Sequence, residues 1–282
     1  MKLDQKSLNA ALNQVMVPAD EVIVCLIRTM TFGHKLGIPA RNIGKHLLNM
    51  LCEAFGTERT VVMAAYYPRF SQEGVFDLRK SPPSTGVVPA AAVESPDWKR
   101  TLTPTNSYVV RGPKTQDIFG LKCTTAWGED GMLSWIINEN ALVILIGIPD
   151  ANNGWLAVHS AEQKLRVPYR YFKRLSGTCF DNGRKLGTIT EVLYVNPITV
   201  ELIQDHSSVT KLLRTQNREK VAADTNVSIR AAHCRDIAEA GEEIIGSNPY
   251  AFVVNSEDAR AWVENGKQNE INSLANENRW PQ

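Results

Sequence analysis

One segment constrains this chain more than any other: an apolar run, then a glycine-containing polar loop, then a short helical pattern. Residues 141–148 are almost entirely apolar and predict a buried strand. The helical pattern that follows the loop carries His159 and Glu162, three residues apart and therefore on one helix face. Open α/β folds bind their ligands where loops leave the carboxyl ends of central strands. We therefore expect an imidazole and a carboxylate to lie together where chemistry takes place.

The rest of the chain alternates between strand and helix patterns. Residues 21–27 and 60–65 predict buried strands, and residues 42–55 between them have helical apolar spacing that ends at Gly56. A strand–helix–strand unit of this kind predicts a parallel crossover. Other expected elements are strands at 107–111, 169–172 and 189–195, helices at 132–139, 198–215, 231–245 and 256–265, and an irregular loop over 66–88. The alternation predicts an α/β fold whose sheet is covered by helices.

Size and charge exclude several classes of partner. The chain has 282 residues and a formal net charge of +1, so no overall field favours nucleic acid or an anionic membrane. Its apolar runs are too short to span a bilayer, and its charged N-terminal segment is not a secretory signal. We expect a cytoplasmic protein with one α/β domain over residues 1–267 and a loose polar tail over residues 268–282.

Cysteine and histidine spacing gives no indication of a metal site. The five cysteines are scattered, odd in number and form no C-x-x-C pair, which favours reduced core thiols. Four further histidines have no partner at metal-ligand spacing: His34, His46, His206 and His233. The glycine-rich phosphate loops, the G-x-S-x-G elbow and the H-E-x-x-H motif are also missing from the sequence. We therefore expect no metal cofactor.

His159 and Glu162 allow two interpretations. A neutral imidazole near its ordinary pKa can take a proton from an amine or hydroxyl, and Glu162 would then hold its tautomer. Alternatively, His159 is a hydrogen-bonded core residue, and Glu162 pairs with a neighbouring cation such as Lys164, Arg166 or Arg170. Local pattern alone favours neither interpretation.

Several segments in order along the chain resemble the aminoglycoside 3-N-acetyltransferase family, also called the antibiotic N-acetyltransferase family. The resemblance covers roughly residues 21–250. It is carried by Val22-Ile23-Val24, Thr60 to Met63, Phe76-Asp77 with Ser81-Pro82 and Gly86, Arg100 with Pro104 and Ser107, Gly128 to Gly131, Leu145 to Gly147, Asn152-Asn153, His159 to Glu162, and Pro168 to Tyr171. The resemblance implies a three-layer α/β fold in which helices flank the sheet.

The resemblance also implies a reaction and its site. An acetyl or other short acyl group would pass from acetyl-CoA, or another acyl-CoA, to a primary amine of a small molecule, with His159 as general base and Glu162 assisting it. The substrate-binding residues implied are Tyr66, Phe76, Asp77, Ser107 and Asn153. The cofactor-binding residues implied are Cys25, Arg28 and Thr103. The acidic residues of the loop, Glu73 and Asp77, would attract a cationic amine or would simply be solvated.

Departures from the family pattern leave alternatives open. Residues 25–27 are Cys-Leu-Ile where the family has His-Ser-Ser, Thr103 replaces a histidine, and residues 64–65 are Ala-Ala where the family has Pro-Thr. Loss of polar partners costs about 1–3 kcal/mol each, so the donor or acceptor is expected to differ. The alternatives are acyl transfer from an acyl carrier protein or to another nucleophile, and a non-catalytic ligand-binding homologue; a homodimer also stays open.

Overall fold

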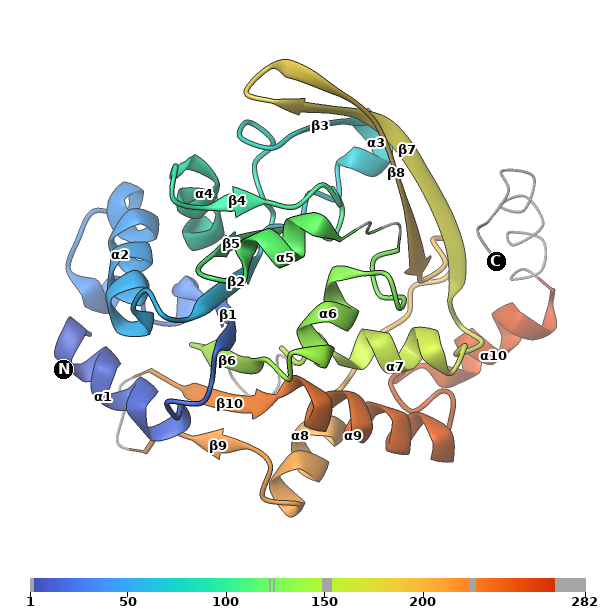
Figure 1. The fold of residues 1–282 in the computed structure, drawn as a ribbon. Coiled ribbons are helices and arrows are strands. Elements are labelled where there is room, and N and C mark those ends of the chain that lie inside the picture. The colour runs from blue at the N-terminus through green and yellow to red at the C-terminus, as the bar shows by residue number, and fades with distance from the viewer. Residues whose placement is uncertain (1–2, 122, 124, 149–153, 224–226, 267–282) are drawn as a thin grey trace.

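A seven-stranded mixed sheet forms the centre of the molecule (Figure 1). The computed structural model describes residues 3–121, 123, 125–148, 154–223 and 227–266. The strands lie in the order β4–β5–β2–β1–β6–β10–β9. Their bounds are β1 Val22–Ile27, β2 Thr60–Ala64, β4 Lys99–Arg100, β5 Tyr108–Arg111, β6 Leu142–Ile146, β9 Lys220–Val221 and β10 Ile229–His233.

The three central strands are parallel and almost entirely buried. β1 pairs in parallel with β2 on one side and with β6 on the other, and every residue of β2 and β6 is buried. Such burial on both faces explains why, apart from Thr60, these strands are apolar rather than alternating. Helix α2 (Ile43–Phe55) connects β1 to β2 and ends at Gly56, whose φ of 71° favours glycine. The expected strand–helix–strand unit with parallel strands is therefore confirmed.

Helices cover both faces of the sheet. One core cluster joins one face of the sheet to α6, α7, α8 and α9, and a second joins the other face to α1, α2 and α4. The remaining helix bounds are α1 Gln5–Val15, α3 Phe70–Glu73, α4 Val87–Glu94, α5 Thr115–Gly120, α6 Met132–Asn138, α7 Val158–Lys164, α8 Ser207–Thr215, α9 Cys234–Ser247 and α10 Ser256–Glu264, with 3-10 turns at Thr29–Thr31, Gly33–Leu36 and Ala40–Asn42. This arrangement is the three-layer α/β fold that the sequence predicts.

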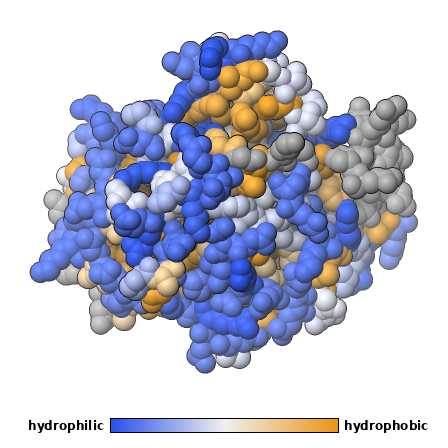
Figure 2. Space-filling view, viewed as in Figure 1, coloured by the Kyte–Doolittle hydropathy of each residue, from blue (hydrophilic) through white to orange (hydrophobic). Residues whose placement is uncertain are grey.

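A second sheet lies over one end of the molecule (Figure 1). It consists of β3 (Val75–Asp77) and the long hairpin of β7 (Tyr171–Asp181) and β8 (Arg184–Val195). Figure 2 shows a group of hydrophobic residues under this hairpin, on a face that is otherwise mostly hydrophilic. Within the described part of the chain, no helix is both long and apolar enough to cross a membrane.

Three expected elements differ from the structure. The loop over residues 66–88 contains α3 and β3, and the helix expected at 198–215 begins only at Ser207. Residues 203–204 instead pair with residues 253–255, so tertiary hydrogen bonds outweigh the local helical spacing. The helix expected at 231–245 is divided into β10 and α9, because alanines at 231 and 232 suit a helix but here complete the sheet beside β6. The tail over residues 268–282 lies outside the described residues.

Candidate active site

Helix α7 holds the two residues that the sequence singles out. It follows β6 in the chain and packs on α9 through Ala161, whose Cβ would lie 3.1 Å from a Cβ placed on Gly241. The buried residues Val158, Ala161 and Glu162 form its inner face. The absence of a side chain at Gly241 lets the two helices approach closely, and this approach fixes the position of α7.

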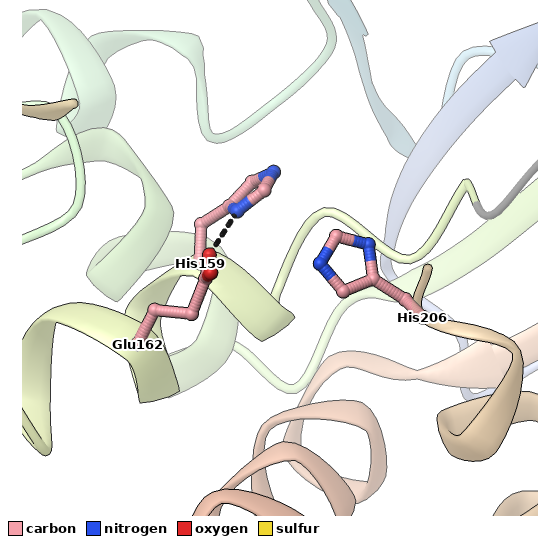
Figure 3. Close-up of side chains that lie close together, drawn as sticks. All are labelled: His159, Glu162 and His206. Carbon is pink, nitrogen blue, oxygen red and sulfur yellow. Dashed lines mark hydrogen bonds and ion pairs between the residues drawn. The ribbon is translucent and has the colours of Figure 1, made fainter. Parts of the chain in front are cut away.

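His159 and Glu162 form a hydrogen-bonded pair. His159 Nδ1 lies 2.6 Å from Glu162 Oε2, as the dashed line in Figure 3 shows. Burial raises the pKa of Glu162, but the Arg170 guanidinium and the hydrogen bond to His159 outweigh it and hold that pKa well below its ordinary value. The carboxylate is therefore ionised and can only accept, so Nδ1 carries the proton. In the neutral ring, the lone pair then lies on Nε2, as a general base requires.

Glu162 is fully buried and hydrogen-bonded on both oxygens. Its Oε1 accepts from the hydroxyl of Tyr169 at 2.7 Å, from Nε of Arg170 at 3.0 Å and from the side-chain amide of Gln204 at 3.3 Å. Arg170 is itself only 4% exposed at its side chain. A buried carboxylate with these partners has little freedom to rotate, so it fixes the His159 ring as well.

The His159 ring is clamped by aromatic neighbours yet reaches solvent. The Trp127 ring stacks on it, with centroids 4.6 Å apart and planes at 17°. The His159 side chain remains 28% exposed, whereas the Glu162 side chain is 0% exposed. The imidazole is therefore held by Trp127 and Glu162 and is partly exposed to solvent, and the pairing of Glu162 with Arg170 that the second interpretation expects is also present.

A second imidazole, that of His206, faces this pair (Figure 3). The His159 and His206 ring centroids lie 5.6 Å apart with the planes at 81°. Potential ligand atoms of His159, Glu162 and His206 lie within 4.8 Å of one another. Burial, together with the nearby His159, lowers the pKa of His206 to about 4, so this ring is neutral at physiological pH. Sequence spacing gave no sign of the approach, because 47 residues separate the two histidines.

Two of the substrate-binding residues that the resemblance implies, Phe76 and Asp77, are buried. Phe76 is 0% exposed in a small cluster under the hairpin, and the Arg100 guanidinium stacks over its ring at 4.7 Å. The Asp77 carboxylate accepts from four backbone N–H groups, those of Arg79, Lys80, Asn182 and Gly183. Burial raises the pKa of Asp77, but these donors more than offset it and lower that pKa overall. Asp77 thus joins β3 to the tip of the β7–β8 hairpin.

The other substrate residues differ in how accessible they are. Ser107 is fully buried, accepts from Nε of Arg100 at 3.1 Å and donates to the carbonyl of Ala65. Tyr66 is half-buried just after β2, and its hydroxyl lies 3.2 Å from that of Tyr108. Asn153 lies outside the described residues. Of this set, Tyr66 has the most accessible described side chain.

The residues implied for the cofactor do not gather at one place. Cys25 is 2% exposed and belongs to the core cluster on the α2 face of the sheet, whereas α7 belongs to the opposite cluster. Thr103 is also buried and donates to the carbonyl of Asn106 at 3.2 Å. Arg28 follows the carboxyl end of β1 and is half-buried. Arg28 alone of the three has both the position and the exposure to meet an anionic ligand.

Solved structures with a similar fold include an aminoglycoside acetyltransferase. The apoenzyme of aminoglycoside acetyltransferase AAC(3)-IVa is 19% identical, with a TM-score of 0.67 over 93% of this chain and 98% of that one. AAC-VIa bound to sisomicin is 15% identical, with a TM-score of 0.68 over 88% and 98% of the two chains. AAC-IIIb in a binary complex with CoASH is also 15% identical, with a TM-score of 0.67 over 88% and 97%. The fold is therefore that of the antibiotic N-acetyltransferases.

The sequence defines the family itself. A profile described as Aminoglycoside 3-N-acetyltransferase matches residues 11–245, and the chain belongs to this family. No curated protein matches the sequence. The protein is accordingly an acyltransferase of the CoA-dependent N-acetyltransferase class, with acyl-CoA as its co-substrate.

Proposed function

We propose that the protein transfers an acetyl or other short acyl group from acyl-CoA to a primary amine of a small molecule, with His159 as general base. The observation that carries this proposal is the ion-paired, fully buried Glu162 behind a partly exposed His159 ring. This arrangement leaves Nε2 of His159 as the basic atom. It supports proton removal from a group that approaches from the solvent side.

The proposed reaction needs one proton carrier and no covalent enzyme intermediate. The amine nitrogen attacks the thioester carbonyl, forming the C–N bond, and its proton passes to Nε2 of His159. The C–S bond then breaks, and the proton passes from His159 to the departing sulfur, which leaves as the CoA thiol. The Glu162 carboxylate stabilises the imidazolium that exists between these two transfers.

The two most accessible of the implied binding residues that the structure describes, Tyr66 and Arg28, are proposed to bind the amine acceptor and the acyl-CoA donor. Tyr66 lies just beyond the carboxyl end of β2, where parallel sheets of this kind bind ligands. Arg28 lies at the corresponding end of β1 and is proposed to contact an anionic part of acyl-CoA. The backbone bonds of Asp77 favour a supporting role for that residue, so its contribution to acceptor binding is proposed to be indirect.

The test is thiol release from acetyl-CoA with a panel of primary amines, and acetylated acyl carrier protein serves as a second donor in the same assay. For a positioned general base, His159→Ala should lower kcat about 10²- to 10⁴-fold. The control is His46→Ala on the exposed face of α2, which should keep wild-type turnover. CoA should raise the melting temperature of both variants as it does that of the wild type. Full activity of His159→Ala would overturn the proposed role, and turnover with the carrier donor alone would overturn the proposed donor.

A further inference from the structure

His206 has a buried polar atom without a partner. The residue is only 8% exposed, and its Nε2 makes no hydrogen bond to any described residue. The Phe252 ring packs edge-on against the imidazole, with centroids 4.7 Å apart, and fixes it from behind. A buried ring nitrogen that lacks a partner costs about 1–3 kcal/mol, so a polar group of a ligand is the natural complement at this position.

The unpaired nitrogen is directed at the catalytic pair. Nε2 lies on the edge of the ring away from the backbone, and Figure 3 shows the His206 ring pointing from its own segment toward His159 and Glu162. Polar atoms of the three side chains lie within 4.8 Å of one another. Two hydrogen bonds of about 2.8 Å, meeting at an open angle on one shared atom, span such a distance. One ring nitrogen of each histidine belongs to this 4.8 Å group, so the space between the two rings is small enough for a single ligand atom to lie near both.

The bonding of Glu162 favours an organic ligand over a metal ion. Two histidines and a carboxylate are common metal ligands. Here, however, Oε1 of Glu162 already accepts from Tyr169, Arg170 and Gln204, and Oε2 is bonded to His159. The Arg170 cation, 3.0 Å from that carboxylate, adds repulsion toward a second cation.

We propose that Nε2 of His206 accepts a hydrogen bond from the same amine nitrogen that His159 deprotonates, and so makes the site selective for primary amines. This inference rests on the proposed function. A neutral primary amine has two N–H groups: one proton passes to His159 as the C–N bond forms, and the other stays hydrogen-bonded to His206. A secondary amine has one N–H, so His206 would be left unpaired in the transition state. The neutral state of His206 fits this acceptor role.

The decisive measurement is selectivity in thiol release between a primary amine and its N-methyl counterpart. His206→Phe keeps an aromatic ring against Phe252 and removes both nitrogens. It should raise KM for the primary amine at least 10-fold and bring the primary-to-N-methyl ratio of kcat/KM toward one. KM for acetyl-CoA should stay unchanged. His206→Gln, whose amide oxygen can accept the same bond, should recover part of the selectivity, and His46→Phe is the matched control on α2.

Each outcome of these measurements either supports or overturns the role proposed for His206. Wild-type selectivity and KM in a folded His206→Phe variant would overturn the inference and leave the proposed function intact. If His206→Phe does not fold, His206→Gln is compared with His206→Leu, and equal selectivity of these two overturns it. Stabilisation of the wild type by Zn²⁺, lost in His206→Phe, would show a metal site instead. A wild-type protein that binds CoA but acylates no amine would overturn both the proposed function and this inference.

Discussion

Glu162 organises the site more than any other single residue. It is fully buried, and its four hydrogen bonds connect α7 to Tyr169, Arg170 and the segment before α8 that carries Gln204. The spacing of His159 and Glu162 predicted their contact, because positions three apart share a helix face. Arg170 was among the neighbouring cations that the sequence offered as partners of Glu162, whereas Tyr169 and Gln204 could not be predicted that way, since the fold alone brings them close.

Replacing Glu162 should destabilise the protein and also slow the proposed acyl transfer. Glu162→Gln keeps the size of the side chain but leaves the buried Arg170 cation without its carboxylate, a change that costs about 3–5 kcal/mol in comparable pairs. Urea denaturation at pH 7 measures this loss. The control is Glu242→Gln, which removes the partner of Lys164 in a more exposed ion pair and should cost less than about 1 kcal/mol. Equal losses for the two variants would contradict the role assigned to the buried pair.

At the scale of elements, the close packing of α7 on α9 decides where the proposed base, His159, lies. A Cβ on Gly241 would stand 3.1 Å from that of Ala161, whereas Gly246, farther along α9, has nothing within 4 Å. Ala161 lies directly before Glu162, so any shift of this contact moves the proposed catalytic pair. Precise placement matters because displacements of about 1 Å can cost around 100-fold in rate.

Enlarging Gly241 should therefore affect both rate and stability. Gly241→Leu is expected to push α7 away from α9, lower kcat at least 10-fold and destabilise the fold by about 1–3 kcal/mol through overpacking. Gly246→Leu adds the same side chain to the exposed side of α9 and should leave kcat unchanged. Thiol release and thermal unfolding of the two variants give the comparison. A Gly241→Leu variant that is as active as Gly246→Leu would show that α7 tolerates displacement.

The sequence predicted some elements well for a physical reason. β1, β2 and β6 are short apolar runs buried on both faces, and α2 has apolar positions at helical spacing, so local pattern and final position agree. β10 could not be separated from α9, because its alanines suit either structure and pairing with β6 decides between them. The position of His206 beside His159 and Glu162 depends on the same kind of long-range contact.

Over the whole molecule, one buried carboxyl group connects the two sheets. Glu191 on β8 is 1% exposed and accepts from the backbone N–H of Thr105, in the loop between β4 and β5, at 2.9 Å. Burial raises the pKa of Glu191 to about 7, although the hydrogen bonds from Thr105 oppose this shift. Its protonated form is therefore favoured by the fold.

The raised pKa of Glu191 makes the protein less stable as pH rises. Because the folded pKa lies above the ordinary value of 4.5, Glu191 lowers the free energy of unfolding progressively as pH rises from about 4.5 to 7. Glu191→Gln cannot ionise, so its stability relative to the wild type should improve by up to about 3 kcal/mol between pH 4 and pH 8. Denaturant unfolding at these two pH values measures the difference. If the difference in free energy of unfolding between the two proteins is the same at pH 4 and pH 8, the fold does not raise the pKa of Glu191.

The hydrogen bonds of Glu162 also show how much of the chain must be present before the His159–Glu162 pair has all of its partners. The contacts of this carboxylate come from residues as far along as Gln204, and His206 follows two residues later. A nascent chain that has left the ribosome only through α7 holds His159 and Glu162 but lacks Arg170, which neutralises the buried charge. Tyr169 and Arg170 precede the β7–β8 hairpin and Gln204 follows it, so the full set of hydrogen bonds to Glu162 requires the chain through residue 204.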